Sequence, residues 1–225
     1  MAEINAAMVK SLRDRTGAGM MDCKNALIES EGNEDKAVEL IQQRGLAKAA
    51  KKAGAIATEG VIHAYIHPGS RLGVLVEINC QTDFVARNEE FKGFVDDVGL
   101  QIASMSPQYV RREEIPAADV AKQKELFLGQ LQEEEQSTGK KRPAQALEKI
   151  VEGKLNKWME ESCLLEQHSI REGDKTIQAM ADELTAKLGE KISIRRFVRF
   201  ELGEGIASAK KDLASEVAET LASSN

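Results

Sequence analysis

The spacing of the apolar residues changes near residue 60, and this change constrains the fold more than any other feature. Up to about residue 45, apolar side chains recur every three or four positions, as on one face of a helix. From Ile62 to Ile78 they alternate instead with other residues, as in strands with one buried face. Helical spacing returns from about residue 88, and alternation reappears after residue 191. This order of elements predicts an α+β fold.

Three short helices are predicted in residues 1–45. The first stops at the glycine-containing turn 16–19, where the chain can reverse tightly. The second ends at Gly32, and the third runs from the N-cap residue Asn33 to Gly45. So small a core gives only marginal stability to an isolated module.

The chain is expected to contain three parts. Residues 1–54 form a helical domain that ends in a basic linker, and the Ala- and Lys-rich residues 46–59 are expected to hold a short helix and a linker. An α+β core follows over residues 55–204, and it includes a helical hairpin at about 117–162. Residues 205–225 form a C-terminal helical module.

The core is expected to hold a three-stranded antiparallel sheet with helices on one face. The first two strands form a hairpin around a turn at residues 68–70, and a helix follows from about 88 to 104. A further helix covers residues 177–188, and a last helix covers 206–222. The third strand is expected to carry one apolar face, made of Ile192, Ile194, Val198, Phe200 and Leu202.

Composition favours a protein that works by binding. The chain has three Cys and three His, and it lacks CxxC, HExxH and phosphate-loop patterns. We therefore expect no enzymatic activity, no metal and no cofactor. The net charge of −6 argues against a general nucleic-acid binder. Few and widely spaced cysteines, with no long apolar stretch and no export signal, predict a cytoplasmic protein without a membrane partner.

The segment from Glu77 to Arg87 leaves a strand and enters a helix, with Asp83 and Phe84 at the junction. Two interpretations are open. Thr82 or Asp83 caps the helix while Phe84 packs into the core. Alternatively, the acid and the aromatic ring are exposed at the corner and contact another protein, since aromatic anchors dominate many interfaces.

Four long segments of the chain carry further information. They are residues 12–27 (LRDRTGAGMMDCKNAL), 77–85 (EINCQTDFV), 148–157 (EKIVEGKLNK) and 199–205 (RFELGEG). In this order, and with a basic linker between the first two, they resemble the elongation factor Ts family. The resemblance covers nearly the whole chain.

The resemblance implies a function in translation elongation. Members of the family bind the GDP form of the GTPase elongation factor Tu, accelerate GDP release and stay bound to the nucleotide-free partner until GTP enters. They perform no covalent chemistry. The resemblance also implies that residues 1–54 hold a module similar to ubiquitin-associated domains.

The resemblance assigns site residues to two groups. The segment Thr82, Asp83, Phe84 and Val85 matches the family segment that intrudes near the magnesium and phosphate site of the GTPase. Lys10, Arg13, Met20 and Met21 match the N-terminal contact surface, and His67 resembles a histidine of longer members. Core packing for the two methionines, and simple exposure for His67, remain open interpretations.

Longer members of the family carry two related strand-and-helix units, whereas one unit is recognised in this chain. We expect a second copy to supply the missing half, which predicts a homodimer. Two other function classes stay open. One is an adaptor that only tethers partners through residues 1–45. The other is an RNA-associated protein that uses residues 44–52 together with Arg195, Arg196 and Arg199.

Overall fold

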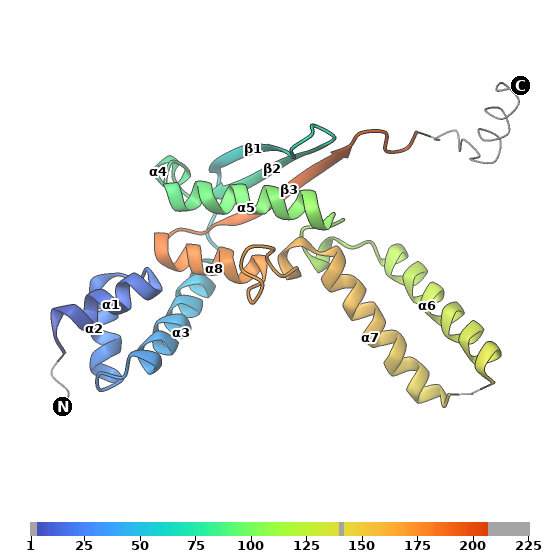
Figure 1. Ribbon diagram of the computed structural model, residues 1–225, viewed down its shortest axis with the longest axis horizontal. Helices are drawn as coiled ribbons and strands as arrows, with labels where there is room; N and C mark the ends of the chain where they lie inside the picture. The colour runs from blue at the N-terminus through green and yellow to red at the C-terminus, as the bar shows by residue number, and fades with distance from the viewer. Residues whose placement is uncertain (1–3, 140–141, 207–225) are drawn as a thin grey trace, which may run out of the picture.

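The computed structural model describes residues 4–139 and 142–206, and it confirms the α+β prediction. Three parts extend in different directions: a group of N-terminal helices, a sheet packed on helices, and a projecting helical hairpin (Figure 1). The elements in chain order are α1 (Ala6–Thr16), α2 (Met20–Glu29), α3 (Glu34–Lys52), β1 (Glu59–Ile66), β2 (Leu72–Cys80), α4 (Asp83–Ala86), α5 (Glu89–Met105), α6 (Ala117–Thr138), α7 (Ala144–Ser162), α8 (Ile177–Leu188) and β3 (Ser193–Glu201).

The three predicted N-terminal helices are confirmed. The Asn5 side chain accepts a hydrogen bond from the Met8 amide at 2.9 Å, and the Asn33 side chain accepts one from the Lys36 amide at 3.0 Å. These bonds satisfy amides that a helix start leaves unpaired. Gly17 ends α1 with a φ of 66°. The helices enclose a small core of Val9, Leu12, Cys23, Ala26, Leu27 and Ala37.

The predicted end of the third helix at Gly45 is wrong, because α3 continues through this residue to Lys52. Gly45 lies against α8, and a Cβ added to it would stand 3.4 Å from the Cβ of Ala186. A small residue at position 45 therefore lets the two helices approach closely. The Ala- and Lys-rich residues that follow favour helix, and Ala49 is buried. The short helix expected within residues 46–59 is thus the last part of α3, which ends at Lys52.

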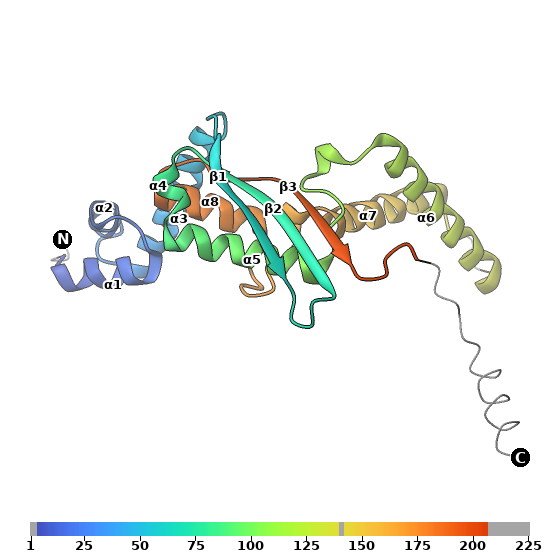
Figure 2. The same cartoon turned by 90° about the horizontal axis from the view of Figure 1, so that it is seen from above.

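The sheet has the order β1-β2-β3 with both pairs antiparallel. Helix α5 packs against β1 and β2, and α8 lies beyond α5 on the same side (Figures 1 and 2). The predicted sheet with helices on one face is therefore confirmed. The core between sheet and helices is mostly aliphatic. Phe91 and Phe94 of α5 are buried in it, and Tyr65 and Phe197 pack against it while partly buried.

The predicted apolar face of the third strand is confirmed for Ile192 and Ile194, which are buried, and is wrong beyond them. Ile194 pairs with Ile78, but Arg196 pairs with Glu77, so Arg195 is an extra residue in β3. Such a bulge reverses the alternation of side chains beyond it. Ile194 is therefore buried, whereas the predicted core residues Val198, Phe200 and Leu202 are exposed.

The inward side of strand β1 carries Val61, His63 and Tyr65, all half-buried. Tyr65 and His63 lie over Gly99 of α5, where a Cβ would stand 2.9 Å from the Cβ of Tyr65. Ile62 and Ile66 point to the opposite face and are exposed.

The predicted helical hairpin is confirmed as α6 and α7. Its base is fixed by an ion pair of Arg112 with Glu166 and by a 2.9 Å hydrogen bond from the Tyr109 hydroxyl to Asp119. Leu131 and Val151 are buried within it. No described helix is long and apolar enough to cross a membrane. The helix predicted for residues 206–222 lies outside the described residues from position 207 onward.

Candidate functional site

A sharp corner joins β2 to α5 and consists of Thr82 and the short helix α4 (Figure 1). Thr82 stands at the N-cap position with extended backbone (φ −130°, ψ 155°), but its side chain makes no capping bond. Asn88 caps α5 instead and accepts a hydrogen bond from the Glu90 amide at 2.8 Å. Val85 packs against the main core, so the corner is anchored from its inner side.

Phe84 projects from this corner into solvent, with 78% of its surface exposed. The interpretation in which Phe84 packs into the core is therefore wrong. Burying an aromatic ring on a partner contributes strongly to binding, so an exposed ring on an anchored corner is suited to a protein contact.

Asp83 lies beside Phe84 at the surface. Its carboxylate accepts a hydrogen bond from Arg87 at 2.8 Å, one helical turn away, and the side chain stays half exposed. An exposed ion pair of this kind is weak, so a partner's donor group can replace Arg87 at small cost.

Thr82 is held by a residue that the sequence did not reveal. The carboxylate of Glu190, in the turn after α8, accepts hydrogen bonds from the Thr82 amide at 2.9 Å and from the Thr82 hydroxyl at 2.7 Å. The Cys80 thiol donates to the Thr82 carbonyl at 3.1 Å. Burial raises the pKa of Cys80, which keeps this thiol protonated as a donor.

The N-terminal candidates all lie at the surface. Lys10 and Arg13 are exposed on α1, and Met20 and Met21 at the start of α2 are 46% and 65% exposed. The interpretation in which Met20 and Met21 pack into the core is therefore wrong. Ile28, at the end of α2, is also exposed and was missed, because its sequence position fits a buried helix face equally well.

His67 lies away from the corner. It follows the end of β1 where Ile66 pairs with Gly73, whereas the corner follows Cys80, which pairs with Glu59 at the opposite end. His67 is exposed, and its Nδ1 is 3.1 Å from the Tyr65 hydroxyl. The structure therefore does not bring His67 together with residues 82–85.

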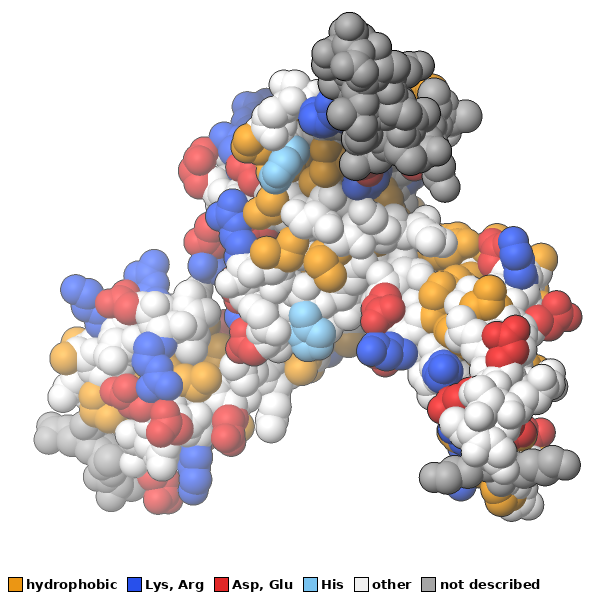
Figure 3. Space-filling model, turned by 45° about the vertical axis from the view of Figure 1, so that its right-hand side comes forward, with side chains coloured by type: hydrophobic (Ala, Val, Ile, Leu, Met, Phe, Trp, Pro, Cys, Tyr) orange, Lys and Arg blue, Asp and Glu red, His pale blue; other side chains and the backbone are white. Residues whose placement is uncertain are grey.

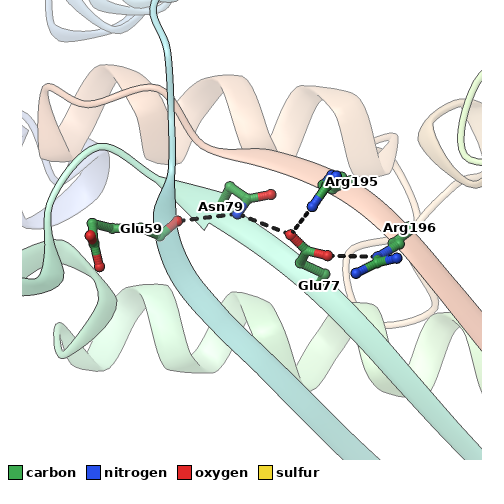
Figure 4. A network of polar contacts seen from close by, with 5 residues as sticks. All are labelled: Glu59, Glu77, Asn79, Arg195 and Arg196. Carbon is green, nitrogen blue, oxygen red and sulfur yellow. Dashed lines mark hydrogen bonds and ion pairs between the residues drawn. The ribbon is translucent and has the colours of Figure 1, made fainter.

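The arginines of the RNA-binding alternative are engaged within the sheet. Glu77 binds Arg195 at 2.8 Å and Arg196 at 2.7 Å (Figure 4). These two hydrogen bonds lower the pKa of Glu77 to about 2. On the face in Figure 3, acidic and basic side chains are interspersed over the N-terminal helices. In α2 and α3, Arg44 is paired with Glu29 and Lys48 with Asp22. These pairs argue against a continuous basic surface for RNA.

Comparison with known proteins gives one consistent result. The sequence model described as "Elongation factor TS" matches residues 3–204. The elongation factor Ts of Desulforamulus reducens is 55% identical, over 97% of this chain and 98% of the relative. That of Carboxydothermus hydrogenoformans is 56% identical over 96% of both chains, and that of Heliobacterium modesticaldum is 53% identical over 95% of this chain and 97% of the relative.

The fold and these matches define a translation elongation factor. The chain belongs to the elongation factor Ts family. The matched relatives have nearly the same length as this chain.

Proposed function

We propose that this protein is a guanine-nucleotide exchange factor that binds elongation factor Tu in its GDP form and accelerates GDP release. The observation that carries the proposal is the exposed Phe84 on a corner that is anchored by Glu190 and by core packing of Val85. A rigid aromatic projection loses little conformational entropy on binding, so its contact energy is available to deform the partner.

The proposed mechanism uses binding energy and no covalent step, so the protein is not an enzyme. An exchange factor must favour the partner conformation that holds nucleotide poorly. Phe84 inserts between elements of the GTPase, and Asp83 exchanges Arg87 for a donor of the GTPase. Together they displace the structure that holds magnesium and phosphate. Because the coupling is reciprocal, nucleotide binding weakens the complex by the same factor, and GTP entry releases the exchange factor.

A second contact surface is proposed on the N-terminal helices. Lys10 and Arg13 offer positive charge there, and Met20 and Met21 offer adaptable apolar contacts. These contacts add affinity and orient the corner on the GTPase. We place this action in the cytoplasm, with a protein partner and with neither nucleic acid nor a membrane.

The exposed face of the sheet supports the proposed homodimer. Helices cover only the other face within the described chain (Figure 2). The outer face carries exposed apolar side chains on all three strands: Ile62, Ile66, Leu75, Val198 and Phe200. A contiguous apolar surface of this kind marks an interaction site. A second copy presents the same surface, and two sheets can pack face to face about 10 Å apart around a two-fold axis.

The exchange function is tested by the release of fluorescent GDP from elongation factor Tu. We expect fast release with the wild-type chain, and a loss on the order of tenfold or more with Phe84→Ala, since a buried aromatic anchor is worth about 2 kcal/mol or more. Asp83→Ala should also slow release, while Glu125→Ala, which removes an exposed carboxylate on α6, should not. Wild-type protein that binds without accelerating release would favour the adaptor function instead.

The dimer is tested by sedimentation of the free protein. The wild type should sediment as a dimer at micromolar concentration, and Phe200→Lys should dissociate it because a buried, unpaired ammonium opposes association. Leu126→Lys, at an exposed leucine on α6 away from the sheet, is the control. A strictly monomeric wild type would rule out the homodimer.

A further inference from the structure

One carboxylate gathers three hydrogen bonds at the base of the corner. Oε2 of Glu190 accepts from the Gln81 amide at 3.1 Å and from the Thr82 amide at 2.9 Å, while Oε1 accepts from the Thr82 hydroxyl at 2.7 Å. Bonds to an ionised acceptor are about twice as strong as neutral ones. Gln81 and Thr82 directly precede α4, the helix that carries Phe84. Gln81, Thr82 and Glu190 are all half-buried.

The Glu190 backbone is itself fixed on both sides. Gly189 ends α8 in the left-handed conformation with a φ of 74°. The Lys191 amide donates to the Gln81 side chain at 3.2 Å, and the Ile192 amide donates to the Thr185 hydroxyl at 3.1 Å. The carboxylate is therefore presented to the corner from one defined position.

The same turn also reaches the N-terminal helices. The Lys191 ammonium donates to the carbonyl of Ala53, which follows α3, at 2.5 Å. Glu190 therefore contacts the corner at Thr82, and the next residue, Lys191, contacts the end of α3 at Ala53.

We propose that Glu190 is a positioning residue that holds the Thr82–Val85 segment ready for insertion. This inference rests on the proposed exchange function. Thr82 donates its hydroxyl to Glu190, and α4 has no side-chain cap of its own. Removing the carboxylate leaves two amides and a hydroxyl without their shared acceptor. The corner then has to be ordered during binding, and the ordering cost is subtracted from the energy that displaces GDP.

The test measures GDP release from elongation factor Tu over a range of exchange-factor concentrations. Glu190→Ala should lower the maximal release rate by roughly tenfold, which corresponds to about 1.4 kcal/mol. Glu190→Gln should recover most of the rate, because its amide oxygen can accept from both backbone amides and its amide nitrogen can donate to the Thr82 hydroxyl. Glu125→Ala is the matched removal of a carboxylate far from the corner, on α6 (Figure 1).

The outcomes separate this inference from the function on which it rests. If Glu190→Ala releases GDP at the wild-type maximal rate while Phe84→Ala is slower, the positioning role is overturned and the exchange function stands. If the wild-type chain does not accelerate GDP release, both the exchange function and the positioning role are overturned. A purely structural role would lower the melting temperature and leave the maximal rate unchanged. Should Glu190→Ala fail to fold, Glu190→Leu and Glu190→Gln decide. The leucine, which has no hydrogen-bond acceptor, should slow release severalfold, and the glutamine should slow it far less. Equal release rates for these two variants would overturn the positioning role.

Discussion

At the scale of single residues, the carboxylate of Glu77 shows how strongly two neighbouring cations act. Arg195 and Arg196 both donate to it, its side chain is only 13% exposed, and its pKa falls from 4.5 to about 2. A carboxyl whose pKa is lower in the folded state stabilises the fold above its unfolded pKa. That contribution is lost as the pH falls toward the folded value.

We therefore expect acid to weaken this link between β2 and β3 between about pH 4.5 and pH 2. Glu77→Gln should remove this part of the pH dependence, and it should also lower stability at neutral pH because both guanidinium groups lose their charged partner. Urea unfolding of both proteins across this range measures the difference. Parallel stability curves for wild type and variant would contradict the expectation.

Residues also show where sequence-based prediction ends. The corner itself was predictable, because Asp83 and Phe84 follow a strand pattern directly and the surrounding segment is long and specific. The exposure of Phe84 was not predictable, because an aromatic residue after a strand can lie either in the core or at the surface. Glu190 gave no signal at all: it lies 108 residues from Thr82, and a single Glu in a turn is common.

At the scale of elements, the contact of α3 with α8 depends on a small residue at position 45. Gly45→Ala should be tolerated, because its Cβ meets Ala186 at an ordinary contact distance of 3.4 Å. It should even stabilise the helix by about 0.5–1 kcal/mol, since glycine disfavours helix. Gly45→Phe should force the helices apart and destabilise the protein.

Thermal unfolding of the two Gly45 variants measures the stability change, and small-angle scattering measures the separation of the N-terminal helices from the core. Equal effects of alanine and phenylalanine would show that the helices do not depend on this close approach.

Element types were predictable, whereas two of their long-range features were not. Caps such as Asn33 and the alternation in β2 are local, so they can be recognised in sequence. The bulge at Arg195 depends on the register with β2, and the continuation of α3 past Gly45 depends on packing against α8. Both features arise from contacts between distant segments, which override local signals.

At the scale of the whole molecule, the candidate surfaces are grouped at one end. The α4 corner and the N-terminal helices lie on the same side in Figure 1, while the hairpin of α6 and α7 projects away from both. The hairpin is joined to the core at its base, through Tyr109, Arg112 and their partners. This arrangement separates the proposed GTPase contacts from the hairpin.

The separation predicts that the outer half of the hairpin can be removed without loss of exchange. Gly129 and Gly153 lie equally far from the tip in residues along α6 and α7, so a short Gly-Ser turn can join them. The deletion removes the buried pair Leu131 and Val151 together, and it leaves the base contacts in place. Circular dichroism should show a folded core, and GDP release should match the full-length chain. A folded variant with slow release would instead place part of the GTPase contact on the hairpin.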